Sequence, residues 1–173
     1  TVDFSSLGAA VLKKVVLFDP NGGKIAASDE IGIRYKFSDV LAGRFGVDSI
    51  SKITAEKLTL KLEIDQAGNW SLQKIIKPQP ERKAEFRGSI AVNAATVAVT
   101  TPNWRRDFTD IGGELDYADL PTIVVDVKGK MGASSIAASG QWVPDQNTRL
   151  ALKIDAIDLA EVQSLLPIAA GAP

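Results

Sequence analysis

Residues 58–64 read Leu-Thr-Leu-Lys-Leu-Glu-Ile, so apolar and polar side chains alternate along the whole stretch. Successive side chains of a β-strand point to opposite faces of the sheet, and this period of two is typical of a strand with one apolar face. The same alternation recurs along the chain and predicts further strands. These are residues 97–99, 114–117, 123–128, 136–142 and 150–154, with Val124 as an interruption.

Turn-forming residues separate these stretches. Residues 19–23, Asp-Pro-Asn-Gly-Gly, predict a hairpin between a strand at 15–18 and a strand that starts at Lys24, because Asn and Gly accept positive φ. Residues 65–69 and 144–147 close two more strands in the same way. Many short strands with little helix between them indicate an all-β architecture.

Three short helices are expected at strand ends. Residues 38–43 have Ser38 as a cap and Gly43 as a stop. Residues 71–76 precede a proline, and residues 158–166 have an aspartate cap and a proline stop.

The proline and charge cluster at residues 78–83 predicts a linker. It divides the chain into a first segment, 1–77, and a second segment, 84–166, followed by a tail, 167–173. Each segment ends with an alternating strand and a short amphipathic stretch. This similarity fits a weak structural repeat, and chance explains it about as well.

Composition restricts the chemistry. The 173 residues are 45% hydrophobic and 24% charged, as in a folded domain. A net charge of −1 argues against nucleic acid as a partner. The chain has no histidine and no cysteine, which removes the commonest general base, thiol catalysis, disulfides and zinc knuckles. We therefore expect no enzyme, no cofactor and no metal site.

Residues 65–76 carry a more specific pattern, Asp-x-x-Gly-Asn-Trp-Ser-Leu-x-x-Ile-Ile. It resembles the strand–turn–G-x-W-x-L signature of the AsmA-like and TamB proteins of diderm bacteria. Residues 15–22 and 37–45 resemble the lead-in to that signature, and residues 154–159 resemble a strand-to-helix phrase common in TamB. The resemblance is strongest over residues 11–77, and residues 84–166 are compatible with it.

The resemblance implies an elongated, curved antiparallel sheet, the β-taco or β-groove, in a protein that is anchored in the inner membrane and reaches through the periplasm. Its implied role is lipid transport between membranes, or outer-membrane biogenesis, with phospholipid acyl chains and an outer-membrane assembly protein as partners. The family's membrane anchor is not in this chain. Because the sequence opens on Thr1 rather than Met, we expect a fragment or a processed product.

A groove for acyl chains needs apolar side chains along one face of the sheet. The alternating strands supply them, although an ordinary closed core would use the same pattern. The candidate groove residues are Leu58, Leu60, Leu62, Ile64, Val97, Val99, Leu115, Tyr117, Ile123, Val125, Val127, Ile136, Trp142, Leu150, Leu152 and Ile154.

Two other functions stay open. A non-catalytic scaffold module for outer-membrane assembly predicts a filled core, no lipid, and association between copies through exposed strand edges. A carboxylate-dependent hydrolase predicts converging acids, for which Glu114, Asp116 and Asp119 are the candidates. The absence of histidine and cysteine makes the enzyme the weakest of the three readings.

Three smaller features allow both a structural and a functional explanation. Asp19, Asn21 and Glu30 fit part of a calcium-loop frame, but hairpin-turn chemistry explains the first two. Residues 104–106, Trp-Arg-Arg, could contact a phosphate, but an exposed loop is the simpler reading. Trp70 is expected to anchor the packing of its strand end.

Overall fold

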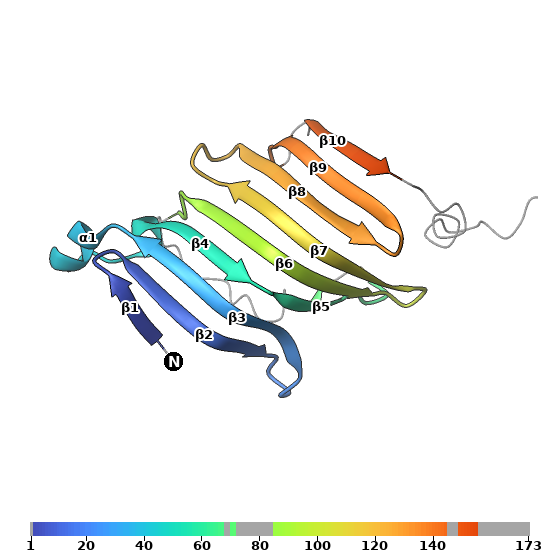
Figure 1. Cartoon of the computed structure of the whole chain (residues 1–173), viewed down its shortest axis with the longest axis horizontal. Helices are drawn as coiled ribbons and strands as arrows, with labels where there is room; N and C mark the ends of the chain where they lie inside the picture. Colours follow the sequence, from blue (N-terminus) through green and yellow to red (C-terminus); the bar gives the residue numbers. More distant parts are fainter. Residues whose placement is uncertain (1, 68–69, 72–84, 145–148, 156–173) are drawn as a thin grey trace, which may run out of the picture.

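The protein is described by a computed structural model that covers residues 2–67, 70–71, 85–144 and 149–155. Within these residues ten strands form one sheet, with one short α-helix and one 3₁₀ turn (Figure 1). The predicted all-β architecture is therefore confirmed. The elements are β1 Val2–Ser6, β2 Ala9–Phe18, β3 Lys24–Tyr35, α1 Phe37–Leu41, η1 Val47–Ser49, β4 Ile50–Glu56, β5 Thr59–Glu63, β6 Ser89–Thr100, β7 Arg105–Asp116, β8 Ile123–Met131, β9 Ser134–Trp142 and β10 Arg149–Asp155.

The sheet consists of two meanders joined side by side. Strands β1 to β4 pair antiparallel in chain order, and so do strands β6 to β10. Strand β5 continues the line of β4 between β3 and β6. The two meanders meet where β4 and β5 pair with β6, and this central pairing is parallel (Figure 1). The sheet is therefore mixed and not purely antiparallel as predicted, and its parallel pairings lie at the centre.

The predicted division at residues 78–83 falls in the connection between the two meanders, outside the described residues. The meanders do not carry separate sheets, because hydrogen bonding continues across β4, β5 and β6. Among the described residues, no second sheet or long helix is present to cover either face.

Residues with positive φ mark a line across the middle of the sheet. Lys14, Lys57, Ala94 and Asp110 all have φ between 50° and 55°, which is unusual for residues with a side chain. Lys57 and Ala94 lie at the same level, since Lys57 donates its N–H to the Asn93 carbonyl group. The registers of β6 with β7 and of β7 with β8 break at β-bulges next to Ala94 and Asp110. Such bulges bend a strand and increase its twist.

These irregularities also keep one face apolar. Ala55 and Leu58 are three residues apart, as are Phe108 and Ile111, and a regular strand would place the members of each pair on opposite faces. At Asp110 an extra residue of β7 opposite β8 restores Phe108 and Ile111 to the same face. At Lys57 no residue is inserted, because the registers with β3 and β6 continue unchanged, and the positive φ of Lys57 accompanies the same reversal of alternation. The residues with positive φ therefore coincide with the points where the alternation slips in the sequence.

The strain at Ala94 gives a testable result. Its φ of 52° costs an L-residue about 1–2 kcal/mol, whereas glycine adopts this conformation readily. We expect Ala94→Gly to raise the free energy of unfolding by about 0.5–1 kcal/mol in urea titrations. Ala98→Gly, on a regular part of the same strand, should lower it by a similar amount. Equal destabilisation by both variants would contradict the role given to the bulge.

The local predictions are mostly confirmed. The Asp19 carboxylate accepts hydrogen bonds from the N–H groups of Asn21 and Gly23 at 2.8 and 2.7 Å, which closes the predicted hairpin. The helix predicted at 38–43 is α1, and Gly43 after it has the positive φ of a helix stop. The predicted Ser38 cap is wrong, because the N-cap position is Lys36 and no side chain caps the helix. The helices predicted at 71–76 and 158–166 and the tail 167–173 lie outside the described residues, except for Ser71.

Candidate functional site

The two faces of the sheet differ sharply in chemistry, and the strand register shows how. Residues directly opposite each other on paired strands present their side chains to the same face. A first apolar row therefore runs across eight strands without a polar side chain. Its members are Leu12, Ile31, Ala55, Val92, Gly113, Val127, Ala138 and Leu152.

A second apolar row lies beside the first on the same face. Its members are Ala10, Ile33, Ile53, Ile90, Leu115, Val125, Gly140 and Leu150. Seven steps between neighbouring strands at about 4.8 Å each give a length of about 34 Å. We call this side of the sheet, with both rows, the apolar face.

The apolar face contains all sixteen candidate groove residues. Leu60 lies opposite Val97, Leu62 opposite Val99, and Ile123 opposite Trp142. Leu115 and Val125 belong to the second row, and Val127 belongs to the first. Ile154 lies opposite Ile136, and Leu150 and Leu152 end the two rows. Leu58, Ile64 and Tyr117 lie just outside strands and reach this face by alternation with Leu60, Leu62 and Leu115.

These side chains do not form a closed core among the described residues. Val99 and Ile123 are buried, but most of the sixteen are half-buried. Trp142 and the three apolar residues of β10 are exposed, and Leu152 has 65% of its surface accessible. The apolar face is thus accessible to a ligand or partner, above all around β9 and β10.

The list of candidate groove residues leaves out several side chains of the apolar face. Ile31, Ile33, Ile53 and Ile90 lie in the two rows, and their alternation with Gly32, Thr54 and Ala91 was a usable signal. Phe108 and Ile111 also face this side, but their spacing of three resembles a helix because the bulge at Asp110 separates them.

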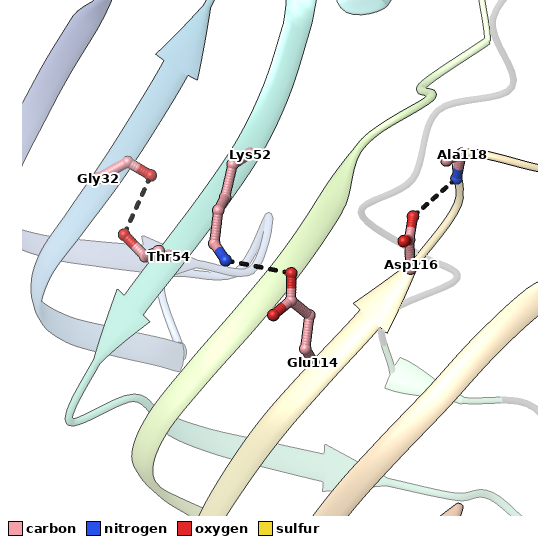
Figure 2. A network of polar contacts seen from close by, with 6 residues as sticks. All are labelled: Gly32, Lys52, Thr54, Glu114, Asp116 and Ala118. Atoms are coloured by element: carbon pink, nitrogen blue, oxygen red, sulfur yellow. Dashed lines mark hydrogen bonds and ion pairs between the residues drawn. The ribbon is translucent and has the colours of Figure 1, made fainter. Parts of the chain in front are cut away.

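The opposite face, which we call the polar face, holds charged pairs that link distant strands. The Lys52 ammonium group on β4 lies 3.1 Å from the Glu114 carboxylate on β7, across β6 (Figure 2). The pKa of Glu114 is lowered, first by a hydrogen bond from the Ser89 side chain and then by the hydrogen bond and charge of Lys52. This pair ties the two meanders together at their parallel junction.

Loss of this pair should have a small, pH-dependent effect. A depressed pKa means that the Glu114 carboxylate stabilises the fold above its unfolded pKa of about 4.3, and that this contribution disappears as pH falls through the folded pKa. Both side chains are partly exposed, so we expect Glu114→Gln to cost less than about 1 kcal/mol at pH 7. Urea titrations should show that the difference closes below about pH 4. A difference that is unchanged at pH 3 would contradict this assignment.

The acids proposed for a hydrolase do not form a common cleft. Glu114 is bound to Lys52, while Asp116 accepts the Ala118 N–H at 2.9 Å and so shapes the turn after β7 (Figure 2). Asp119 accepts the Thr122 N–H through its backbone carbonyl. Within the described ranges, no three acidic side chains come together in a way that would hold a metal ion.

Shallow hollows lie on the polar face. One, of about 580 Å³, is lined by Glu30, Gly32, Arg34, Lys52 and Thr54 among others. A neighbouring hollow of about 510 Å³ continues past Thr54 to Gly112 and Lys128. Small residues leave this space, and Gly32 lies against the Thr54 hydroxyl group (Figure 2). Both hollows lie on the side opposite to the candidate groove residues.

The structure revises two other interpretations of the sequence. Arg105 and Arg106 are not in an exposed loop, because both lie in β7, and Arg106 is opposite Val99 on the apolar face. Trp70 forms a bridge with Ile64 and so closes the end of β5, but 42% of its surface is accessible. The helix predicted after it, at 71–76, lies outside the described residues except for Ser71.

Comparisons with known proteins add no identification. No family model matches the chain, and no curated protein matches its sequence. In the part of the chain that the structure describes, no helix is long and apolar enough to cross a membrane.

Proposed function

We propose that this chain is a periplasmic segment of an AsmA/TamB-like envelope protein, and that its apolar face binds or conducts phospholipid acyl chains between the inner and outer membranes. The observation that carries the proposal is the pair of apolar rows, which cross eight strands without a polar side chain.

The dimensions support an acyl chain as the ligand. The rows extend about 34 Å, and the hydrocarbon core of a whole bilayer is about 30 Å thick, so one fatty-acyl tail fits along a row with room to move. Each methylene that leaves water contributes about 0.8 kcal/mol, so a tail needs no specific polar contact. A row without polar side chains also gives such a tail no fixed stopping point, as conduction requires.

The absence of a covering layer over the described strands supports the same function. Leu150, Leu152 and Trp142 would expose a large apolar area to water if nothing covered them, and soluble proteins rarely leave such patches uncovered without a purpose. Lipid would satisfy this surface. The exposed edge of β10 favours the second function, a scaffold module that associates through strand edges.

Native mass spectrometry with lipid extraction tests the proposal. The purified chain is measured directly and again after incubation with phospholipid vesicles. We expect adducts with the mass of a phospholipid, and a matching lipid in the extract. A bare protein mass in both samples, with no uptake from the vesicles, would reject lipid binding and favour the scaffold function.

A further inference from the structure

Strand β10 ends the sheet with an open edge. It pairs only with β9 among the described strands, and all seven of its residues, Arg149–Asp155, are exposed. An exposed edge presents a row of unpaired backbone N–H and C=O groups that another strand can use. The other strand could come from a different protein or from a second copy of this chain, and the sequence of β10 distinguishes between them.

The strand is complementary to itself when it is turned around. In an antiparallel pair centred on Leu152, this residue meets its own copy and Leu150 meets Ile154. These apolar residues all belong to the apolar face. On the polar face Arg149 meets Asp155 of the other copy, and this ion pair forms twice because of the two-fold symmetry.

We propose that β10 pairs antiparallel with β10 of a second copy, with the two-fold axis at Leu152, so that two sheets join into one. The axis is perpendicular to the sheet, so each face continues into the same face of the partner. The first apolar row then runs through both copies and meets at Leu152. Because the two-fold contact uses the same edge on both chains, it closes as a dimer and does not grow into a fibre.

The proposed pairing breaks few interactions that β10 already makes. Asp155 lies 3.2 Å from Lys153 of its own strand, but both side chains are highly exposed. Ion pairs of this kind contribute little to stability, so Asp155 is available to a second cation. The proposal does not depend on lipid binding, because backbone pairing and charge complementarity suffice for it.

Charge reversal tests the register. Sedimentation equilibrium of the wild-type chain should show a monomer–dimer equilibrium. Arg149→Asp and Asp155→Arg each place like charges opposite each other twice, and we expect each to weaken dimerisation at least tenfold. The double variant R149D/D155R restores opposite charges and should return the dissociation constant to within about threefold of wild type. Lys153→Asp is the matched control, because residue 153 meets Ala151 and its reversal should change dimerisation by less than threefold.

A cross-linking experiment tests the symmetry directly, since the chain has no cysteine of its own. Leu152→Cys brings two thiols together on the axis, where opposite residues have Cα atoms about 4.5–5.5 Å apart and a disulfide can form. Leu150→Cys is the control, because the two copies of residue 150 are four residues out of step, about 14 Å apart. We expect mild oxidation to cross-link the Leu152→Cys chain readily and the Leu150→Cys chain at least tenfold less.

Several outcomes would overturn the proposal. A wild-type chain that stays monomeric up to several hundred micromolar rejects it, as does a double variant that fails to recover. Equal cross-linking at residues 150 and 152 would point to non-specific contact, and a dimer without cross-linking at 152 would indicate a head-to-tail contact with the other edge. Circular dichroism of each variant shows that the fold is kept, which is expected for such exposed positions.

Discussion

Phospholipid binding should fall at least tenfold in Leu152→Asp and in Leu60→Asp. Each change puts a carboxylate on the apolar face, where an acyl chain would have to cover it. Covering a charge without a partner costs several kcal/mol, and 1.4 kcal/mol already corresponds to tenfold in affinity. Leu152 has 65% of its surface accessible and Leu60 is half-buried, so the first variant should keep its stability better than the second. The amount of lipid per protein in the extract, after vesicle incubation, is the measurement.

The neighbouring residues provide matched controls. Ala151→Asp and Lys61→Asp introduce the same side chain one position away, on the polar face. They should leave lipid binding within about twofold of wild type. If the Ala151 and Leu152 variants lost lipid equally, a general effect of charge would explain the loss, and the apolar face would not be the binding surface.

Lipid binding and dimerisation can be separated with the same variants. Leu60 lies in β5, at the centre of the sheet and away from β10, so Leu60→Asp should lose lipid without a change in association. Arg149→Asp should lose the dimer and keep the lipid, because residue 149 lies on the polar face. Failure of one proposal therefore leaves the other intact.

The sequence predicts the apolar face well because alternation is a local property. Leu58, Leu60 and Leu62 report which side of their strand is apolar without any knowledge of the neighbouring strands. Since one face of this sheet is predominantly apolar, strands predicted one at a time agree with each other once they are paired. Turn residues and a glycine stop are local signals too, which is why the hairpin at 19–23 and helix α1 are placed correctly.

The features that the sequence does not reveal depend on contacts between distant parts of the chain. The parallel pairing of β4 and β5 with β6 joins residues that are about 37 positions apart in the chain, and no turn motif reports such a contact. The positive φ values of Lys57, Ala94 and Asp110 are equally hidden, because Lys, Ala and Asp rarely mark positive φ as glycine does. Burial is hidden too, since alternation is the same in a closed core and on an open face. The sixteen candidates were therefore identified as one face, but their accessibility needed the structure.

A second large effect is expected at Gly113, in the first apolar row. This residue has φ of 151°, and a Cβ atom here would collide with the Asp126 carbonyl oxygen and lie 2.6 Å from Val127 Cα. Both contacts are with the backbone of β8, which cannot move aside as a flexible side chain can. Gly113→Ala combines backbone strain with overpacking, each worth about 1–3 kcal/mol. We expect the free energy of unfolding to fall by about 2–4 kcal/mol in urea titrations.

Gly112 is the matched control because it is adjacent in the chain and lies on the other face. A Cβ atom at Gly112 would come no closer than 3.6 Å to the Val92 carbonyl oxygen, which is an ordinary contact. Gly112→Ala should therefore change stability by less than about 1 kcal/mol, and the reduced freedom of the unfolded chain favours a small gain. Equal losses at the two positions would mean that β7 does not tolerate any side chain in this region. A large loss at Gly113 alone would show that β7 and β8 need a glycine there to approach closely, and that the small residues of the apolar rows are required by strand packing as well as by any ligand.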